Sequence, residues 1–179
     1  AHWSPINDPS STGIHFLSAD PNSTQNIIIN EYDKIFLSTD GGNSFKIIYI
    51  PNSGIVRVAG VVWDNGLIII GTNEGLLVSR DSGLSFNIES VPGISTDEGM
   101  FHLSHAKIGN DITLYCVTAH QDYLAPWNDP RSVKDDVRNI YKFKFNSQAL
   151  WQNIRNNIQS DLKILWVDNA KNNANILWA

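Results

Sequence analysis

The chain has 179 residues, of which 42% are hydrophobic and 17% are charged, so we expect one globular domain with a sizeable core. Its formal net charge is −5, with only 13 lysines and arginines, which argues against nucleic acid or an anionic membrane as a partner. The single cysteine excludes an internal disulfide, and no apolar run approaches the roughly 20 residues of a membrane-spanning helix. We expect neither a metal nor a cofactor.

Short apolar runs bounded by Asn, Asp or Gly recur along the first half of the chain, and each predicts a strand that is buried on both faces. We assign these runs to two units, at about residues 14–50 and about residues 56–90. The runs are Asn26–Asn30 and Lys34–Leu37 in the first unit, and Leu67–Gly71 and Gly75–Val78 in the second.

The second half of the chain predicts a third unit of four strands at about residues 100–154, and the start of a fourth at about residues 162–179. The best helical pattern, over Ser132–Ile140, predicts at most a short helix. At the other end of the chain, His2–Ile6 resembles the outer strand of a preceding unit. The strands expected in the third and fourth units are Met100–Ile108, Asp111–Ala119, Asn139–Phe145, Leu150–Ile154, Leu162–Val167 and Asn175–Trp178.

An octet with the pattern S-x-D-x-G-x-S-F occurs at residues 38–45 and again at residues 79–86, a spacing of about 41 residues that matches four-stranded propeller blades. Because each octet lies between two predicted strands, we expect a hairpin, in which the Asp accepts backbone hydrogen bonds and the Gly takes a positive φ. A repeated structural clasp is favoured over a catalytic carboxylate, because catalysis rarely needs the same acid in every blade. The structural residues are Ser38, Asp40, Gly42, Phe45, Ser79, Asp81, Gly83 and Phe86.

With these two octets the chain resembles the Asp-box, or bacterial neuraminidase repeat, propellers of the sialidase-like superfold. The resemblance implies an all-β chain in which residues 1–179 form a partial β-propeller of four-stranded antiparallel blades, about three of them complete, with partial blades at both ends. The stretch Ala19–Asn22, followed by an apolar strand and an octet, most resembles xyloglucanase-type glycoside hydrolases and related secreted repeat proteins. The resemblance therefore also implies secretion, to the extracellular space or the periplasm.

The resemblance further places the octets on the face away from the ligand, and the longest ligand-side excursion at about residues 120–137. Aromatic side chains beside carboxylates suit a sugar there, because pyranose faces stack on rings while carboxylates bind hydroxyls or transfer protons. We expect Asp122 and Asp129 to supply a glycosidase pair, either with each other or with Asp97. The expected ligand-binding residues are His120, Tyr123, Trp127 and Arg131.

The aromatic residues also have a structural interpretation. In that interpretation Tyr123 and Trp127 only pin the excursion onto the propeller. The remaining tryptophans of interest, Trp63, Trp166 and Trp178, fall in predicted strands, and we expect them in the core rather than as stacking platforms.

Three functions stay open at this point. A glycoside hydrolase-like protein acting on polysaccharide is one, a non-catalytic module that binds a glycan or a protein is another, and a purely structural segment is the third. A sialidase is disfavoured, because no arginine precedes an Ile-Pro pair and Arg80 lies inside an octet. A fold shared by so many proteins does not choose among these functions.

Stacked sheets bury their faces only against neighbours, and a propeller needs about four to eight blades to close. Three blades with loose strands at each end would leave apolar faces and unpaired edges exposed. We therefore expect either a fragment of a longer chain or self-association, for example two copies related by a two-fold axis that complete a ring of about eight blades.

Overall fold

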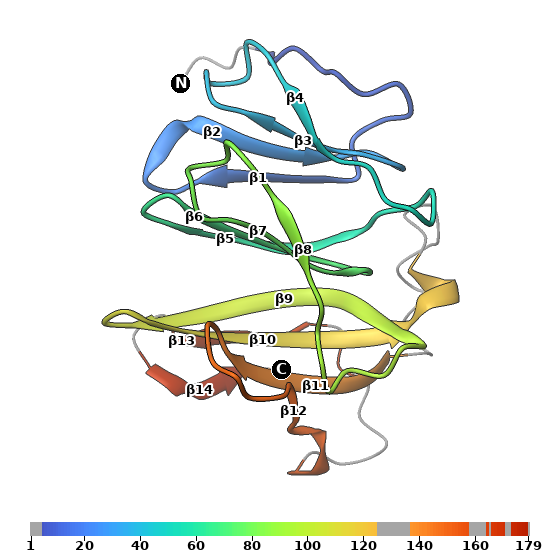
Figure 1. Cartoon of the computed structure of the whole chain (residues 1–179), viewed down its shortest axis with the longest axis vertical. Helices are drawn as coiled ribbons and strands as arrows, with labels where there is room; N and C mark the ends of the chain where they lie inside the picture. The colour runs from blue at the N-terminus through green and yellow to red at the C-terminus, as the bar shows by residue number, and fades with distance from the viewer. Residues whose placement is uncertain (1–4, 125–136, 158–163, 165, 171–172, 179) are drawn as a thin grey trace.

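The structure, a computed structural model, describes residues 5–124, 137–157, 164, 166–170 and 173–178. It contains three four-stranded antiparallel sheets and one two-stranded pair, and within every sheet the strands lie side by side in chain order (Figure 1). The described helices are two single turns of 3-10 helix. The prediction of an all-β chain is therefore confirmed.

The strands of the first sheet are β1 (Phe16–Asp20), β2 (Ser23–Asn30), β3 (Ile35–Ser38) and β4 (Lys46–Tyr49). The second sheet consists of β5 (Val58–Asp64), β6 (Leu67–Thr72), β7 (Gly75–Ser79) and β8 (Asn87–Glu89). The third consists of β9 (Glu98–Ile108), β10 (Asp111–His120), β11 (Val137–Lys144) and β12 (Gln152–Asn153). The final pair is β13 (Asp168–Ala170) with β14 (Asn173–Trp178), and the 3-10 turns are η1 (Gln121–Tyr123) and η2 (Arg155–Asn157).

The segment before β13 differs from its prediction. A strand over Leu162–Val167 is wrong for the described residues of that range, because none of them belongs to a strand and β13 begins only at Asp168. Ile164 and Val167 are nevertheless buried, packed on the third sheet. An irregular segment with buried apolar side chains has the same composition as a short strand. The apolar run therefore predicted a strand where the chain is irregular.

Two further predicted elements fall partly outside the described residues. The helix predicted over Ser132–Ile140 is wrong for residues 137–140, which form the start of β11, where Ile140 pairs with Val117. Of the strand predicted at His2–Ile6, the structure describes residues 5 and 6, and neither lies in a strand. Residues 1–4 and 132–136 lie outside the described part of the chain.

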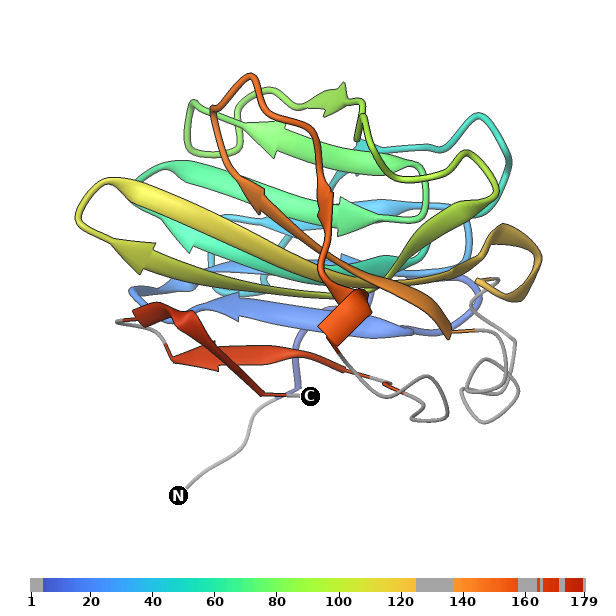
Figure 2. The same ribbon diagram turned by 90° about the horizontal axis from the view of Figure 1, so that it is seen from below.

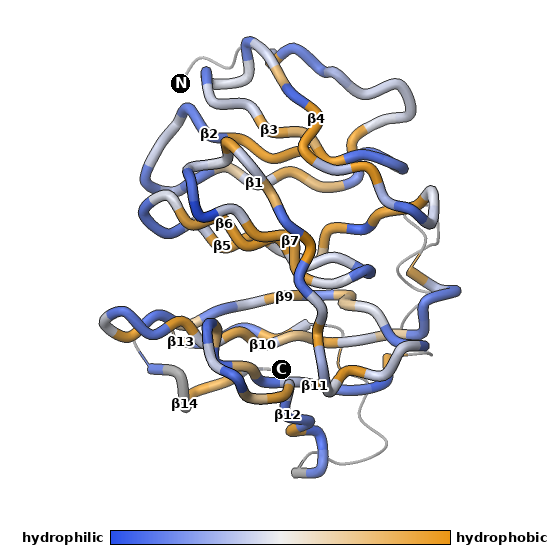
Figure 3. Tube along the Cα trace, in the orientation of Figure 1, coloured by the Kyte–Doolittle hydropathy of each residue, from blue (hydrophilic) through white to orange (hydrophobic). Residues whose placement is uncertain are grey.

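Hydrophobic residues are concentrated along the inner strands (Figure 3), and because successive side chains of a strand point to opposite faces, consecutive buried residues such as Ile68–Ile70 supply apolar groups to both faces of a sheet. In β6, Ile69 belongs to the core shared with the third sheet, whereas Ile68 and Ile70 belong to the core shared with the first. β10 repeats this alternation between the second sheet and the segment that leads into β13. The sheets are therefore stacked face to face, as the doubly buried apolar runs predicted.

Contacts between the sheets concentrate at their first strands, β1, β5, β9 and β13, which form a common inner edge. Figure 2 shows β8 and the β11–β12 turn on one side of the molecule and the β13–β14 pair on the opposite side. At Gly60 of β5 the backbones come so close that an added Cβ would lie 2.4 Å from the Leu103 carbonyl oxygen of β9. Glycine permits this contact because it has no Cβ.

Both octets form the same hairpin between a third and a fourth strand. The Asp40 carboxylate accepts hydrogen bonds from Ser38 Oγ at 2.8 Å, from Ser44 N at 2.9 Å and from Ser44 Oγ at 2.6 Å. Ser38 Oγ in turn accepts a hydrogen bond from Gly42 N at 2.9 Å, where the φ angle is +87°. The second octet repeats this network through Ser79, Asp81, Gly83 and Ser85. Phe45 and Phe86 are half-buried and directly precede β4 and β8.

Residues 5–15 lie over the face of the first sheet that points away from the second sheet (Figure 1). Asn7 N donates to the Gly42 carbonyl at 3.2 Å, and His15 N donates to the Asn30 carbonyl at 2.9 Å. On this face Ile29 and Phe36 are only 1% and 5% exposed. The expectation of an exposed apolar face at this end is therefore wrong for the middle of the sheet, because the chain covers it with its own N-terminal segment.

Candidate ligand-binding face

The loop face is the end of the sheets opposite to the octets. It carries the β2–β3 and β6–β7 turns, the β4–β5 and β8–β9 connections, and η1. Antiparallel order forces this arrangement, because successive turns of a meander alternate between the two ends of a sheet. The face therefore gathers residues from several sheets, as a binding site requires.

Four of the residues predicted for a ligand site meet at one corner of the loop face. The Gln121 backbone N–H donates to the Asp97 carbonyl at 2.9 Å, which ties η1 to the β8–β9 connection. His120 Nδ1 lies 3.5 Å from Asp122 Oδ2 and accepts a hydrogen bond from Asp122 N. The rings of His120 and Tyr123 meet edge to face with centroids 6.2 Å apart. The other predicted residues, Trp127, Asp129 and Arg131, lie outside the described residues.

Two of the predicted acids lie at this corner, Asp97, which is ionised, and Asp122, which is exposed to water. A hydrogen bond from Ser95, helped by the charges of Arg138 and His120, lowers the pKa of Asp97. The Arg138 guanidinium lies 3.5 Å from the Asp97 carboxylate. The Asp122 side chain is 83% exposed. Asp97 can therefore accept hydrogen bonds or a proton, but it does not hold a proton to donate near neutral pH.

Glu98, the carboxylate next to Asp97, lies in the segment expected on the ligand side but is not among the predicted site residues. Glu98 is 8% exposed and accepts hydrogen bonds from Thr118 Oγ1 at 2.5 Å and from Asn139 Nδ2 at 2.7 Å. Burial, followed by this carboxylate, raises the pKa of Tyr141 to about 12. The same two causes raise the pKa of the Cys116 thiol, which therefore stays protonated and inert in the core.

A pocket of about 380 Å³ opens beside Glu98, between the second and third sheets. We call it the intersheet pocket. Its described lining combines two carboxylates with amide, hydroxyl and apolar side chains, and the β8–β9 connection supplies most of them. The lining residues used below are Asn73, Glu74, Val91, Pro92, Ile94, Glu98 and Gln121.

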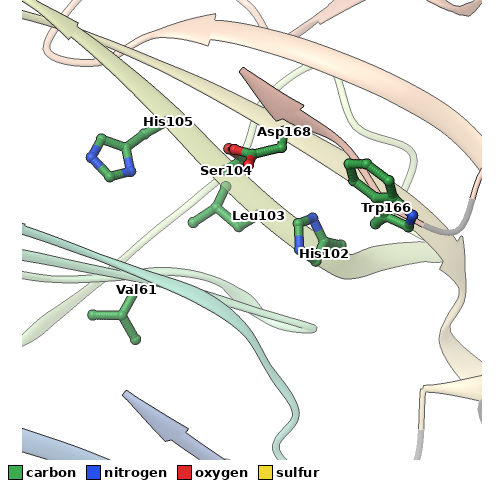
Figure 4. A pocket seen from close by; sticks show the side chains of 7 residues that line it. All are labelled: Val61, His102, Leu103, Ser104, His105, Trp166 and Asp168. Atoms are coloured by element: carbon green, nitrogen blue, oxygen red, sulfur yellow. The ribbon is translucent and has the colours of Figure 1, made fainter. Parts of the chain in front are cut away.

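A second pocket, of about 280 Å³, lies at the inner edge, where three first strands meet (Figure 4). We call it the axial pocket. It is lined by Val61 of β5, by His102 to His105 of β9, by Trp166 in the segment before β13, and by Asp168, the first residue of β13. Trp166 is 51% exposed here, so its predicted place in the core is wrong.

Of the other two tryptophans expected in the core, Trp63 packs against it and Trp178 does not. Trp178 is 60% exposed on β14. Trp63 is half-buried against the first sheet and donates from Nε1 to Ser18 Oγ at 3.0 Å. Among the described residues no cluster of His, Cys, Asp and Glu is arranged to hold a metal ion, and no helix is long and apolar enough to cross a membrane.

Comparison with known proteins places the fold. No family model and no curated protein matches the sequence. An ancestral GH74 enzyme superposes with a TM-score of 0.50 at 14% identity, over 88% of this chain and 27% of that chain. YCF48 bound to D1 peptide superposes with a TM-score of 0.54 at 17% identity, over 93% of this chain and 48% of that chain.

The chain thus spans less than half of the length of either structure. At these identities the likeness concerns the fold and not the activity. Together with the stacked four-stranded sheets and their shared inner edge, it identifies the fold as a β-propeller, in which the described residues form three four-stranded blades followed by a two-stranded partial blade.

Proposed function

We propose that this chain is a non-catalytic Asp-box propeller module, and that its intersheet pocket binds a protein segment through a lysine or arginine side chain. One observation carries the proposal. Glu74 and Glu98 both line the pocket, while no lysine or arginine is among its described lining residues. Two uncompensated carboxylates in a concave site attract a cation and repel an anion.

The carboxylates are held in place by neutral donors. Glu98 accepts from Thr118 and Asn139, and Glu74 accepts from the Tyr49 hydroxyl at 2.5 Å and from Ser53. Neutral donors fix the carboxylate oxygens without adding positive charge, so the pocket stays negative and preorganised.

The apolar part of the same pocket fits the stem of a long basic side chain. Val91, Pro92 and Ile94 line it beside the carboxylates. Lysine and arginine bury their methylene stems on apolar surface while the charged head reaches a polar partner. The pocket therefore offers both halves of such a side chain a suitable surface.

A binding role is favoured over hydrolysis by the state of the described acids. Glycoside hydrolysis needs one carboxyl that donates a proton and a second that acts as base or nucleophile. Asp97 has a lowered pKa, and Asp122 is 83% exposed instead of closed off from water. The likeness to YCF48 bound to D1 peptide, of which this chain covers 48%, supports a protein partner.

The test uses two peptide arrays that differ in one charge. One array carries random nonapeptides with arginine at the central position, and the other carries the same peptides with citrulline there. We expect the chain to prefer the arginine array by about tenfold or more, which corresponds to about 1.4 kcal/mol for one charge-assisted contact. Glu74→Gln and Glu98→Gln should each remove most of this preference.

Asp111→Asn is the matched control, because Asp111 is an exposed carboxylate at the opposite end of the same pair of strands as Glu98. It should leave the arginine preference unchanged. Equal capture of both arrays, or a preference that survives Glu74→Gln, would overturn the proposal. Sugar release from a polysaccharide panel would select the hydrolase instead.

We further propose that the chain associates with a second copy through β14. Within the described residues β14 pairs only with β13, and its Ile176 and Trp178 side chains are 42% and 60% exposed. An apolar edge strand of this kind is a template for strand pairing. Antiparallel pairing of β14 with its own copy satisfies two-fold symmetry.

A further inference from the structure

We propose that the axial pocket binds one neutral sugar ring, stacked on the Trp166 indole. This site is separate from the intersheet pocket and does not depend on the proposed function. Three elements build it, so no single strand or loop determines its shape: β5, β9 and the segment that leads into β13. Its volume of about 280 Å³ lies at the small end of ligand pockets, which suits a single ring.

Trp166 is exposed although its neighbours are buried. Its neighbours Ile164 and Val167 are buried, at 6% and 0% exposure, and they anchor the segment on the third blade. The indole itself is 51% exposed and stands beside His102 at the pocket (Figure 4). A large aromatic ring held open to water by buried neighbours is a preformed platform, and a pyranose face covers such a ring.

The Asp168 carboxylate is the hydrogen-bond acceptor of the axial pocket. Asp168 Oδ1 accepts hydrogen bonds from Ser104 Oγ at 2.9 Å and from the Asn169 backbone N–H at 2.8 Å. Ser104 Oγ also lies 2.7 Å from Asn169 Oδ1. These contacts fix the orientation of the carboxylate, as a site needs before the ligand arrives.

The His102 imidazole is the hydrogen-bond donor of the axial pocket. His102 Nδ1 faces the backbone N–H of Val167 at 3.4 Å and accepts from it, which leaves the proton of a neutral ring on Nε2. Burial lowers the pKa of His102, so the ring is neutral near pH 7. The pocket thus combines an imidazole N–H donor, a carboxylate acceptor and an indole face, which together match the hydroxyls and the apolar face of a sugar.

The same groups argue against charged ligands. The described lining holds no lysine or arginine to bind an anion, and Asp168 would repel one. An ammonium ion would suit Asp168 and the indole, but it has no acceptor to offer the His102 N–H. A neutral polyhydroxy ring uses all three groups.

The experiment measures binding to the whole chain by saturation-transfer NMR and calorimetry. The probes are the methyl glycosides of glucose, galactose, mannose and xylose, with tetramethylammonium chloride and sodium sulfate as the cationic and anionic arms. We expect at least one glycoside to bind with a millimolar Kd, and neither salt to compete with it. Trp166→Ala should weaken that binding at least tenfold, and Trp166→Phe, which keeps a smaller platform, should weaken it less.

Trp178→Ala is the matched control, because Trp178 is a similarly exposed tryptophan that does not line the axial pocket. It should change the Kd less than twofold. Thermal unfolding of every variant establishes that the fold persists. The inference is wrong if none of the four glycosides binds, if tetramethylammonium binds in their place, or if Trp166→Ala and Trp178→Ala behave alike.

Discussion

Asp40 and Asp81 accept hydrogen bonds that hold the two octet hairpins, and these bonds also control their ionisation. The Ser44 hydroxyl, followed by the Ser44 backbone N–H, lowers the pKa of Asp40 to about 2 from its ordinary value of 3.8. Ser85 does the same for Asp81, whose pKa is also about 2. Because folding lowers these pKa values, the ionised carboxylates stabilise the fold above about pH 4, and this stabilisation is lost as the pH falls toward about 2.

The double substitution Asp40→Asn with Asp81→Asn tests this linkage. We expect a lower free energy of unfolding than in the wild type at pH 6, and a difference between the two proteins that shrinks as the pH falls from about 4 to about 2. Urea unfolding at a series of pH values measures it. A difference that stays constant down to pH 2 would contradict the assigned pKa values.

Single residues differed in how well the sequence predicted their roles. The octet contacts lie within eight residues of chain, so the spacing of Ser, Asp and Gly was enough to predict a hairpin. Trp166 and Glu98 line pockets that form only when β9 packs against segments distant in the sequence. No local sequence pattern predicts which side chains are buried or exposed by such packing. The corner of Asp97, His120 and Asp122 was predictable as a group, because β9 and β10 pair at that end.

Adjacent blades come closest at β5 and β9, and glycine makes that approach attainable. The methyl group of an alanine at Gly60 would lie 2.4 Å from the Leu103 carbonyl oxygen and 3.1 Å from its Cβ. A backbone oxygen cannot rotate out of the way as a side chain can. Relief would therefore require the two strands to move apart.

We expect Gly60→Ala to destabilise the fold by about 1–3 kcal/mol, the usual cost of overpacking a close-packed interior. Denaturant unfolding of the variant measures this loss. The reference is the wild-type chain, because Gly60 has no positive φ and an alanine there adds only the steric clash. A Gly60→Ala protein as stable as the wild type would show that the blades tolerate a wider spacing.

Strands were predictable wherever both neighbouring sheets bury them, as in β6 and β10, because the apolar runs there are long and bounded by turn residues. The segment before β13 was not, since its buried residues Ile164 and Val167 follow an irregular path. Residues 137–140 have apolar residues at helical spacing, but they form a strand because they pair with β10. Tertiary pairing decides such short segments, and the sequence alone does not display it.

At the scale of the whole molecule, the proposed β14 contact predicts a dimer. We expect the wild type to sediment as a dimer at micromolar concentration, and the double substitution Ile176→Lys with Trp178→Lys to sediment as a monomer that still unfolds in one cooperative thermal transition. Lysine on an edge strand blocks pairing, because it would have to bury its charge. Analytical ultracentrifugation across a concentration series makes the measurement.

Leu84→Lys serves as the control for this substitution. Leu84 is 81% exposed in the second octet, far along the chain from β14, so its replacement should leave the dimer intact. A wild type that stays monomeric throughout the concentration series would sink the proposed association.

The segment of residues 5–15 gives such an assembly a definite size. Head-to-tail addition of copies requires a receptive surface at both ends of each molecule, and it then continues into open fibres. Here residues 5–15 already cover the outer face of the first blade, with Asn7 and His15 hydrogen-bonded to it. We therefore expect the proposed β14 contact to form a closed pair of molecules rather than an open fibre.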